Sequence, residues 1–141
     1  MKTLLALFTS FVFVAAASAA VETYNIDPVH SSVNFSIRHF FSNVPGSFAK
    51  VHGTINVDRD DLTKSYVEAT IDIASLTTNN GMRDRDVLSK KYFDASQFPT
   101  ATFKSTSWTK SGADAYDVTG DLTIKGITKS VVLHVKSLGF G

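Results

Sequence analysis

The sequence predicts an all-β domain in which an antiparallel sheet curls into a barrel or sandwich. Apolar and polar residues alternate in six segments, and this period of two gives a strand one apolar face. Short turns rich in Asp, Gly and Pro join the segments, as they do between antiparallel neighbours. Six or seven strands connected in this way are typical of small all-β domains.

Three strands are predicted in the first half of the chain, at residues 32–39, 51–57 and 67–73. In the first of them, His39 continues the apolar series. Gly53 interrupts the second, which suggests a bulge or bend of the kind that lets sheets curl.

Three further strands are predicted at residues 101–109, 116–124 and 130–138. Turn residues mark the ends of the strands, at Asp27–Pro28, Val44–Gly46, Asp58–Asp61, Ser111–Gly112 and Lys125–Gly126.

The segment from residue 79 to 94 breaks this rhythm. It lacks alternation and carries the densest charge cluster, at residues 83–86. A short helix is expected there, beginning near Asn80, because Asn is a favoured helix N-cap.

Residues 1–19 have the parts of a cleavable signal peptide. Lys2 supplies a positive start, residues 4–17 form an almost unbroken apolar stretch, and Ala17-Ser18-Ala19 offers the small side chains that signal peptidase accepts. Cleavage is expected after residue 19 or 20. The apolar stretch is shorter than the roughly 20 residues of a spanning helix, which argues against a membrane anchor. The remaining domain, residues 21–141, is therefore expected to act outside the cytoplasm.

The composition excludes several classes of function. The net charge of +1 includes Lys2, so the expected domain is formally neutral, and no basic stripe indicates nucleic-acid binding. The chain has no Cys, which excludes thiol chemistry, iron–sulfur clusters and Cys-ligated zinc. No cofactor is predicted.

The end of the chain carries an apolar predicted strand with nothing after it to pair with. An unpaired apolar edge invites aggregation, and the strand count is short of the roughly eight that small ligand-holding barrels use. The barrel is therefore expected to be incomplete at the C-terminus, with further strands missing. A homodimer fits the same observation, because exposed sheet edges pair readily.

Six phrases of the sequence, in order and covering nearly all of residues 21–139, resemble the YceI-like family. They are Tyr24-Asn25-Ile26-Asp27-Pro28-Val29-His30-Ser31, Val33-Asn34-Phe35-Ser36-Ile37-Arg38-His39, Val44-Pro45-Gly46-Ser47-Phe48, Ser75-Leu76-Thr77-Thr78-Asn79 followed by Arg83-Asp84, Tyr92-Phe93-Asp94 with Phe98-Pro99-Thr100-Ala101-Thr102-Phe103-Lys104-Ser105, and Gly120-Asp121-Leu122-Thr123-Ile124-Lys125-Gly126-Ile127-Thr128-Lys129.

The resemblance implies a lipocalin-like antiparallel barrel, exported to the periplasm, whose elongated apolar cavity holds a long-chain isoprenoid or a related fatty amphiphile. This chain departs from the family by lacking its last strands. It also carries Asp86 and Val87 where many relatives have His-Leu, so a role of that His does not transfer.

A long apolar tail would enter such a cavity by burial alone, at roughly 0.8 kcal/mol per CH₂. The predicted ligand-binding residues are inward positions on the strands and two polar residues near the opening: Phe35, Ile37, His39, Ile55, Ile71, Ile73, Arg83, Phe103, Leu122 and Ile124. Plain core packing is the alternative for the apolar ones. For Arg83, contact with an anionic head group competes with a structural role, which we favour, in which its loop closes one end of the sheet.

No catalytic or metal site is predicted. The chain has no Gly-x-Ser-x-Gly, Cys or His-Glu-x-x-His signature, and His30, His39 and His52 lack the paired spacing of metal ligands. The leading hypothesis is an exported lipid-binding protein for transport, storage or stress response. One alternative is a structural or stress-related envelope protein whose barrel its own side chains fill. The other is a metal- or His-dependent hydrolase at His30 and His39.

Overall fold

The computed structural model describes residues 21–140, so the expected signal peptide lies outside the described residues. The chain folds as antiparallel β-structure with a single short α-helix in the described part, as predicted. Its strands are β1 (Glu22–Asn25), β2 (Val33–His39), β3 (Ser42–Phe48), β4 (Val51–Val57), β5 (Tyr66–Asp72), β6 (Leu76–Thr77), β7 (Thr100–Lys110), β8 (Ala115–Ile124) and β9 (Ile127–Lys136), and its helices are η1 (Leu62–Lys64), η2 (Ile73–Ser75) and α1 (Gly81–Leu88).

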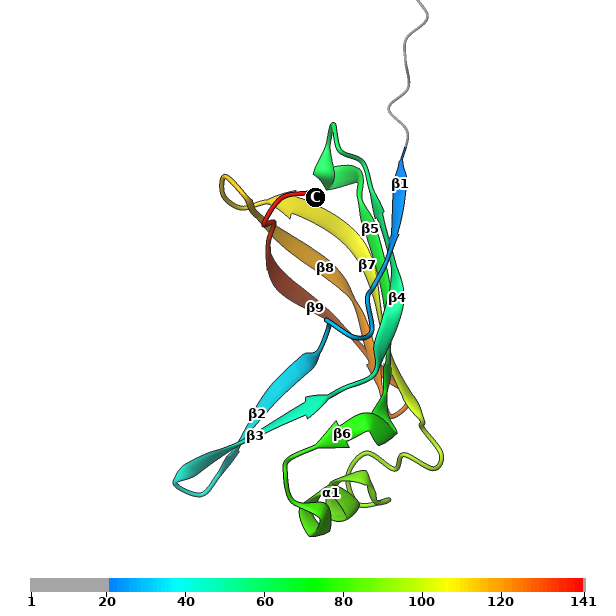
Figure 1. Ribbon diagram of the computed structural model, residues 1–141, viewed down its shortest axis with the longest axis vertical. Coiled ribbons are helices and arrows are strands. Elements are labelled where there is room, and N and C mark those ends of the chain that lie inside the picture. The colour runs from blue at the N-terminus through cyan, green and yellow to red at the C-terminus, as the bar shows by residue number, and fades with distance from the viewer. Residues whose placement is uncertain (1–20, 141) are drawn as a thin grey trace, which may run out of the picture.

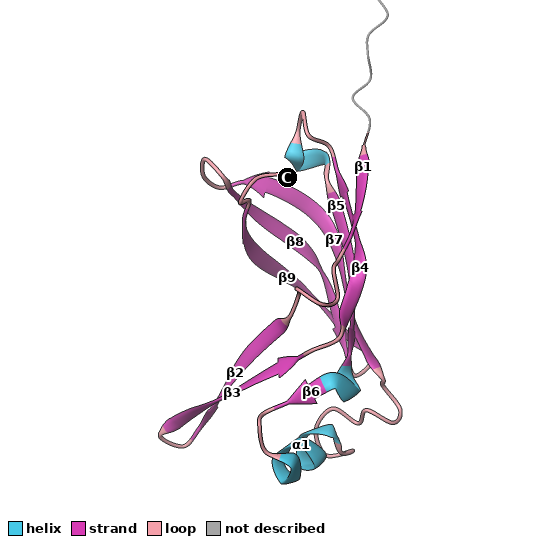
Figure 2. Ribbon diagram, in the orientation of Figure 1, coloured by secondary structure: helices cyan, strands magenta, loops and turns pink. Residues whose placement is uncertain are grey.

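The strands form two sheets. A six-stranded sheet has the order β1-β4-β5-β7-β8-β9, and a three-stranded sheet has the order β2-β3-β6. Figure 1 shows the large sheet curling, with the β2–β3 hairpin projecting from one end of the molecule and α1 at that same end. Figure 2 shows that strands make up most of the regular structure and that short helical segments lie at both ends.

The expected barrel does not close in residues 21–140. The strands β1 and β9 are the two edges of the large sheet and are not paired with each other. The β2–β3 hairpin pairs with itself and with β6, so it leaves the large sheet instead of extending it. A barrel needs continuous pairing around its circumference, and here the sheet instead forms an open trough.

The prediction of a turn at Val44–Gly46 is wrong, because these residues lie within β3. The turn lies earlier, at Phe40 and Phe41, between the paired residues His39 and Ser42. Pro45 is tolerated in the strand because β3 meets β6 only at Ser47 and Phe48, which leaves Pro45 with a partner strand on one side only. The strand β3 and the short strands β1 and β6 are not among the six predicted strands.

Gly53 allows close contact between strands and does not form the expected bulge. The pairing of β4 with β5 runs without interruption through Gly53, whose φ is +151°. A Cβ atom there would collide with the backbone carbonyl of Glu68. The bulge lies in β7, between Ser105 and Ser107.

The buried core forms two clusters under the ends of the sheet. One contains Phe48, Ile73, Leu76 and Ala101 and packs against α1 and the segment that follows it. The other contains Phe103, Tyr116 and Val118. Val118 alone is less than 2% exposed, and no single block of side chains fills the curl of the sheet in the described residues.

The predicted helix is confirmed as α1, and Asn80 is its N-cap. The Asn80 side chain accepts hydrogen bonds from the amides of Met82 and Arg83, both at 3.1 Å. The Asp84 carboxylate accepts from the Thr78 amide and hydroxyl, at 2.8 and 2.6 Å. Arg83 donates to the Thr78 hydroxyl and carbonyl, at 2.8 and 2.7 Å. Both charged residues therefore fasten α1 to the end of β6.

Replacing Gly120 by Ala should destabilise the sheet. The new methyl group would meet the Phe103 ring and lie 2.6 Å from the backbone oxygen of Lys104. Overpacking of this kind costs about 1–3 kcal/mol. Urea unfolding of Gly120→Ala should show that decrease in the free energy of unfolding. Gly81→Ala is the control, because no atom outside its own helix backbone and its chain neighbours lies within 4 Å of its Cβ position. Equal stability of the two variants would contradict this packing.

The contact of Asp84 with Thr78 should make stability depend on pH. The Thr78 hydroxyl, with the Thr78 amide and Arg83 adding to it, holds the Asp84 pKa below its ordinary value of 3.8. A carboxyl whose pKa is lower in the folded state stabilises the fold above the unfolded-state pKa, and loses this effect as the pH falls through the folded-state pKa. Between about pH 6 and pH 3, the urea midpoint of Asp84→Asn should therefore fall less than that of the wild type.

Asp86→Asn is the matched control for this comparison. It makes the same charge change on the same helix, but no hydrogen bond to the Asp86 carboxylate is present in the described part of the chain. Its midpoint should fall with pH as the wild type's does. Identical pH profiles for Asp84→Asn and Asp86→Asn would show that the Thr78 contact is not a source of stability.

Candidate functional site: an apolar trough with a polar mouth

The curl of the sheet encloses a hollow of about 580 Å³ whose wall is apolar. Side chains from β2, β3, β4, β5, β7, β8 and β9, together with Ile73 and Phe93, build this wall. We call it the trough. Its lining is Val33, Phe35, Ile37, Phe48, Val51, Ile55, Val67, Ala69, Ile71, Ile73, Phe93, Ala101, Phe103, Trp108, Val118, Leu122, Ile124, Val131, Leu133 and Val135.

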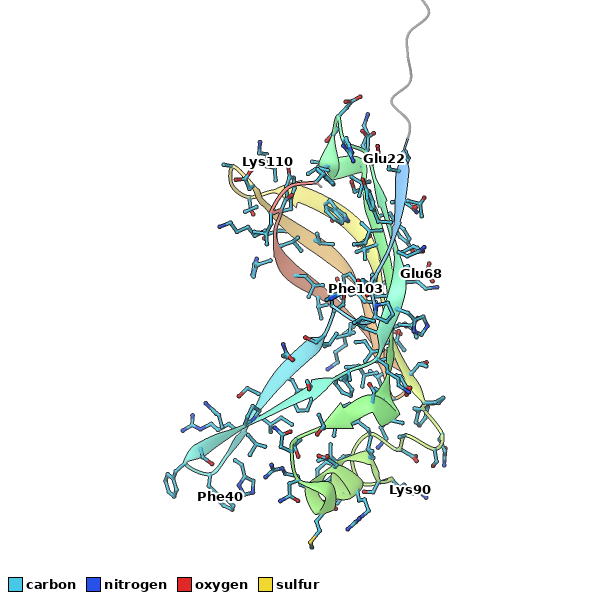
Figure 3. The ribbon with its side chains drawn as sticks, viewed as in Figure 1. Glu22, Phe40, Glu68, Lys90, Phe103 and Lys110 are labelled. Carbon is cyan, nitrogen blue, oxygen red and sulfur yellow. The ribbon has the colours of Figure 1, made fainter. Side chains whose placement is uncertain are left out.

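The wall follows directly from strand pairing. Ala69 of β5 lies opposite Phe103 of β7, which lies opposite Leu122 of β8. Because side chains in register share a face of the sheet, the apolar half of each alternating strand points the same way. Figure 3 shows Phe103 within the curl. Small residues such as Ala69 leave the space that larger side chains would fill.

The trough is long and continues at both ends. Along β7 its wall runs from Ala101 to Trp108, eight residues whose ends lie roughly 23 Å apart at strand spacing. A second hollow of about 350 Å³ shares Ile55, Trp108 and Val135 with it. A third, of about 510 Å³, shares Phe35, Ile37, Phe93 and Ile124.

The third hollow is the polar mouth of the trough. In addition to its apolar residues it is lined by His39, Thr78, Arg83, Asp86, Tyr92 and Lys125. Lys125 donates to the backbone oxygen of Lys90 at 3.2 Å, which holds its ammonium at the opening. Arg83 lines the mouth while its guanidinium is also bound to Thr78, and it forms no ion pair in residues 21–140.

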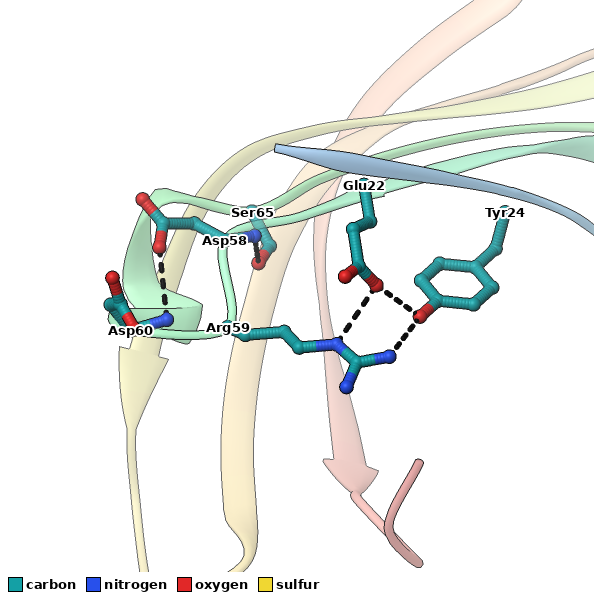
Figure 4. A network of polar contacts seen from close by, with 6 residues as sticks. All are labelled: Glu22, Tyr24, Asp58, Arg59, Asp60 and Ser65. Carbon is teal, nitrogen blue, oxygen red and sulfur yellow. Dashed lines mark hydrogen bonds and ion pairs between the residues drawn. The ribbon is translucent and has the colours of Figure 1, made fainter. Parts of the chain in front are cut away.

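The opposite end carries a second polar network, shown in Figure 4. Arg59 donates to Glu22 at 2.8 Å and to the Tyr24 hydroxyl at 2.7 Å, and Tyr24 donates to Glu22. The Tyr24 hydroxyl, with Arg59, lowers the Glu22 pKa below its ordinary value, and the same contacts raise the Arg59 pKa. Phe140 lies against Tyr24 and over the guanidinium, 4.8 Å from Cζ to ring centroid. The network holds the C-terminal residues across this end.

The structure brings the ten predicted ligand-binding residues together in the trough and its mouth. The eight apolar ones, Phe35, Ile37, Ile55, Ile71, Ile73, Phe103, Leu122 and Ile124, line the trough. His39 and Arg83 line the mouth. The structural role and the proposed head-group contact of Arg83 are compatible, because its guanidinium is bound to Thr78 and Arg83 also lines the mouth. Contact with a ligand remains a prediction for all ten residues.

Sequence reasoning left out other residues of the wall. Val131, Leu133 and Val135 of β9 follow the same alternation and could have been included from the pattern alone. Phe93 and Lys125 could not, because they come from connections whose place is set only by the tertiary fold. Trp108, the chain's single Trp, lines the trough, and its buried indole N–H has no partner in residues 21–140.

The histidines do not assemble into a metal site. His30 pairs with Asp27 and His134 pairs with Asp117, each at 2.7 Å. The length of β2, seven residues or roughly 20 Å, separates His30 from His39, which is too far for one metal ion. No group of three or more acidic or His residues in the described part of the chain is arranged to hold a metal. The described residues therefore give no shared metal site to the hydrolase hypothesis at His30 and His39.

No helix formed by residues 21–140 has the length and apolar character needed to cross a bilayer.

Comparison with known proteins relates this fold to others. The YceI-like domain matches residues 24–141. A UPF0312 protein of Photorhabdus laumondii is 39% identical over 143 residues, covering 99% of this chain and 74% of that protein. Protein YceI of Escherichia coli O157:H7 is 38% identical over the same shares of the two chains.

Solved structures agree with the sequence matches. Burkholderia cenocepacia BcnA is 29% identical and superposes with a TM-score of 0.72, covering 86% of this chain and 74% of its own. A polyisoprenoid binding domain from Saccharophagus degradans, 15% identical with a TM-score of 0.54, shares the fold over 73% of this chain and 59% of its own. The domain match over residues 24–141 and the curated relatives at 38–39% identity show that this chain belongs to the YceI-like family.

Proposed function

We propose that the protein binds a long-chain isoprenoid or a related amphiphile, with the apolar tail in the trough and the polar head at the mouth. One observation carries the proposal, namely a hollow of about 580 Å³ with an entirely apolar wall that the side chains of residues 21–140 leave unfilled. Its size falls within the range of about 300–1,000 Å³ common for small-molecule sites. The Saccharophagus degradans neighbour is described as a polyisoprenoid binding domain, which supports this ligand class.

Burial of apolar surface would drive binding. Wall residues remain open to water without a ligand, with Ile37 49% and Leu133 44% exposed. A hydrocarbon chain laid along them removes both surfaces from water, at roughly 0.8 kcal/mol per buried CH₂. The proposed ligand-binding residues are the eight apolar ones named above, with His39 and Arg83 at the head group.

The mouth favours an anionic head. Arg83 and Lys125 line it with fixed positive charges, His39 adds a ring nitrogen, and Asp86 is its single acidic residue in the described part of the chain. Guanidinium groups match the oxygens of phosphate in geometry and charge. A head such as phosphate therefore fits this opening better than a cationic one.

The unfilled trough weighs against the alternative of a structural envelope protein with a self-filled barrel. We further propose that residues 1–19 direct export to the periplasm, where an apolar chain needs a protein cavity to cross water. Transport, storage and stress response all fit such binding. A binding role is the proposal that the mouth supports, since it places positive charges at the opening of an apolar trough.

Filling part of the trough should weaken tail binding. Ala69→Phe places a ring in the hollow that Ala69 lines. If the ring displaces only two methylene groups of a polyprenol, affinity falls by about 1.6 kcal/mol, or more than tenfold. Trp108, the single Trp, lies in the wall and gives a fluorescence signal for titration with the polyprenol. Native mass spectrometry of the purified protein gives a second measurement of occupancy.

Thr70→Phe is the matched control. Thr70 neighbours Ala69 on β5, and successive side chains of a strand face opposite sides of the sheet. Its affinity for the polyprenol should equal that of the wild type. If the wild type takes up no polyprenol or fatty amphiphile, or if both variants bind equally, the proposal is wrong.

Removing the charge of Arg83 should affect the head group and leave the tail alone. We expect Arg83→Gln to weaken binding of a polyprenyl phosphate by roughly tenfold or more, the effect of losing a hydrogen bond to a charged group. Its affinity for the uncharged polyprenol of equal chain length should stay unchanged. Because Arg83 also donates hydrogen bonds to Thr78, urea unfolding of the variant is measured as well, to separate a loss of stability from a loss of binding. Equal losses for both ligands would assign Arg83 to structure alone.

A further inference from the structure

The tip of the β2–β3 hairpin exposes two phenylalanines that the fold does not use. Phe40 is 79% exposed and Phe41 is fully exposed. They form the two-residue turn between His39 and Ser42, and Figure 3 shows Phe40 at the far end of the hairpin. Single exposed apolar residues are common on protein surfaces. Two adjacent aromatic rings at a projecting tip expose apolar surface, and the contact of that surface with water is unfavourable.

The backbone at this turn is equally unusual. Phe40 has a φ of +52°, in the left-handed region that disfavours bulky side chains. Two-residue hairpin turns with a positive φ at the first position prefer Gly there. Folding alone would therefore select a residue other than Phe. An outlier of this kind points to a role for the rings outside the fold.

The same end of the molecule is basic. Figure 3 places Lys90 at the end that carries Phe40, and Figure 1 places α1 there. The hairpin, α1, the segment up to residue 99 and the β8–β9 turn supply the basic residues Arg38, Arg83, Arg85, Lys90, Lys91 and Lys125. The acidic residues of these segments are Asp84, Asp86 and Asp94, of which Asp94 is buried. We call this region the basic end.

The opposite end carries charges of both signs. Asp58, Asp60 and Asp61 of the turn before η1 lie there with Glu22, and so do the basic residues Arg59, Lys64 and Lys110. The exposed rings therefore lie at the positive end of a molecule that is formally neutral apart from Lys2. Met82 on α1 adds a further apolar side chain there, 76% exposed.

The mouth of the trough opens on the basic end. His39, next to Phe40, lines the mouth, and so do Tyr92 and Lys125. The rings of His39 and Phe40 are in contact, with centroids 4.6 Å apart. A surface that received the phenylalanine tip would thus face the opening.

We propose that the basic end docks onto an anionic lipid surface, with Phe40 and Phe41 inserted at the level of the head groups. Aromatic side chains are enriched at membrane–water interfaces, and Lys and Arg near the surface are attracted to anionic lipids. Docking brings the mouth against the bilayer, so that an amphiphile passes between membrane and trough without crossing water. Docking itself needs no ligand in the trough, so its test is separate from that of the proposed function.

Vesicle flotation of the full-length chain tests the proposal. Wild type should float with vesicles of equal parts phosphatidylcholine and phosphatidylglycerol, and weakly or not at all with phosphatidylcholine alone. Phe40→Gly combined with Phe41→Ser removes both rings and supplies the residue that the turn prefers, so the variant should fold at least as well. Its partition onto anionic vesicles should fall by about tenfold or more, because burial of even one Phe ring is worth that factor.

Two controls separate the tip from other apolar surface. Leu133→Ser removes a side chain exposed within the trough, and Leu138→Ser removes one at the opposite end, 90% exposed. Both should float as the wild type does, and residues 1–20 are common to all variants. If Leu133→Ser lowers flotation as much as the tip variant, or if the tip variant floats like the wild type, the docking proposal is wrong.

The charge contribution is tested by Lys90→Glu with Lys91→Glu, which should reduce flotation on anionic vesicles and leave the sedimentation coefficient unchanged. Sedimentation velocity also tests the alternative that the phenylalanine tip binds a second copy of this chain. A wild-type dimer that becomes monomeric in the Phe40→Gly, Phe41→Ser variant, without vesicle binding, would overturn lipid docking in favour of self-association.

Discussion

The alternating strands of the large sheet carry their apolar side chains on one face, and the hydrogen bonds between strands hold those side chains in register. In the stretch where Ala69, Phe103 and Leu122 lie side by side, the register decides what points into the curl. The right-handed twist of paired strands then bends this face around a hollow. Because the strands in residues 21–140 do not close, the side chains of the wall meet too few partners to fill the space, and the trough is the consequence.

Polar contacts make the two ends of the trough different. At one end Thr78 holds both Asp84 and Arg83, which fixes α1 beside the opening and leaves a basic mouth. At the other, Arg59 joins Glu22 to Tyr24, and Phe140 packs against the pair. Both networks are small and partly exposed, so their contribution to stability is modest. Their effect is to orient the trough, with charge recognition at the mouth and aromatic packing at the far end.

An apolar wall alone does not identify a ligand site, since core packing also uses apolar side chains. Here the wall residues Leu133 and Ile37 are 44% and 49% exposed, whereas the core residues are buried. A binding trough has to accept and release an apolar molecule through water or from a membrane. The hairpin tip places its two phenylalanines beside the mouth, so a surface for collecting such a molecule and the space for holding it lie at the same end.

The sequence by itself determined the all-β class, four of the five predicted turns, the helix at Asn80 and the apolar faces of the strands, because each depends on residues close together in the chain. It did not reveal that Val44–Gly46 pair with β2, because Pro and Gly are typical turn residues. The structure shows why Pro45 fits in a strand, since β3 has a partner on one side only at this position. It could not show that Phe93 and Lys125 reach the trough, or that Arg83 is held by Thr78. Only the tertiary structure decided that the curl stays open in residues 21–140, because closure depends on hydrogen bonds between strand edges that are distant in the chain.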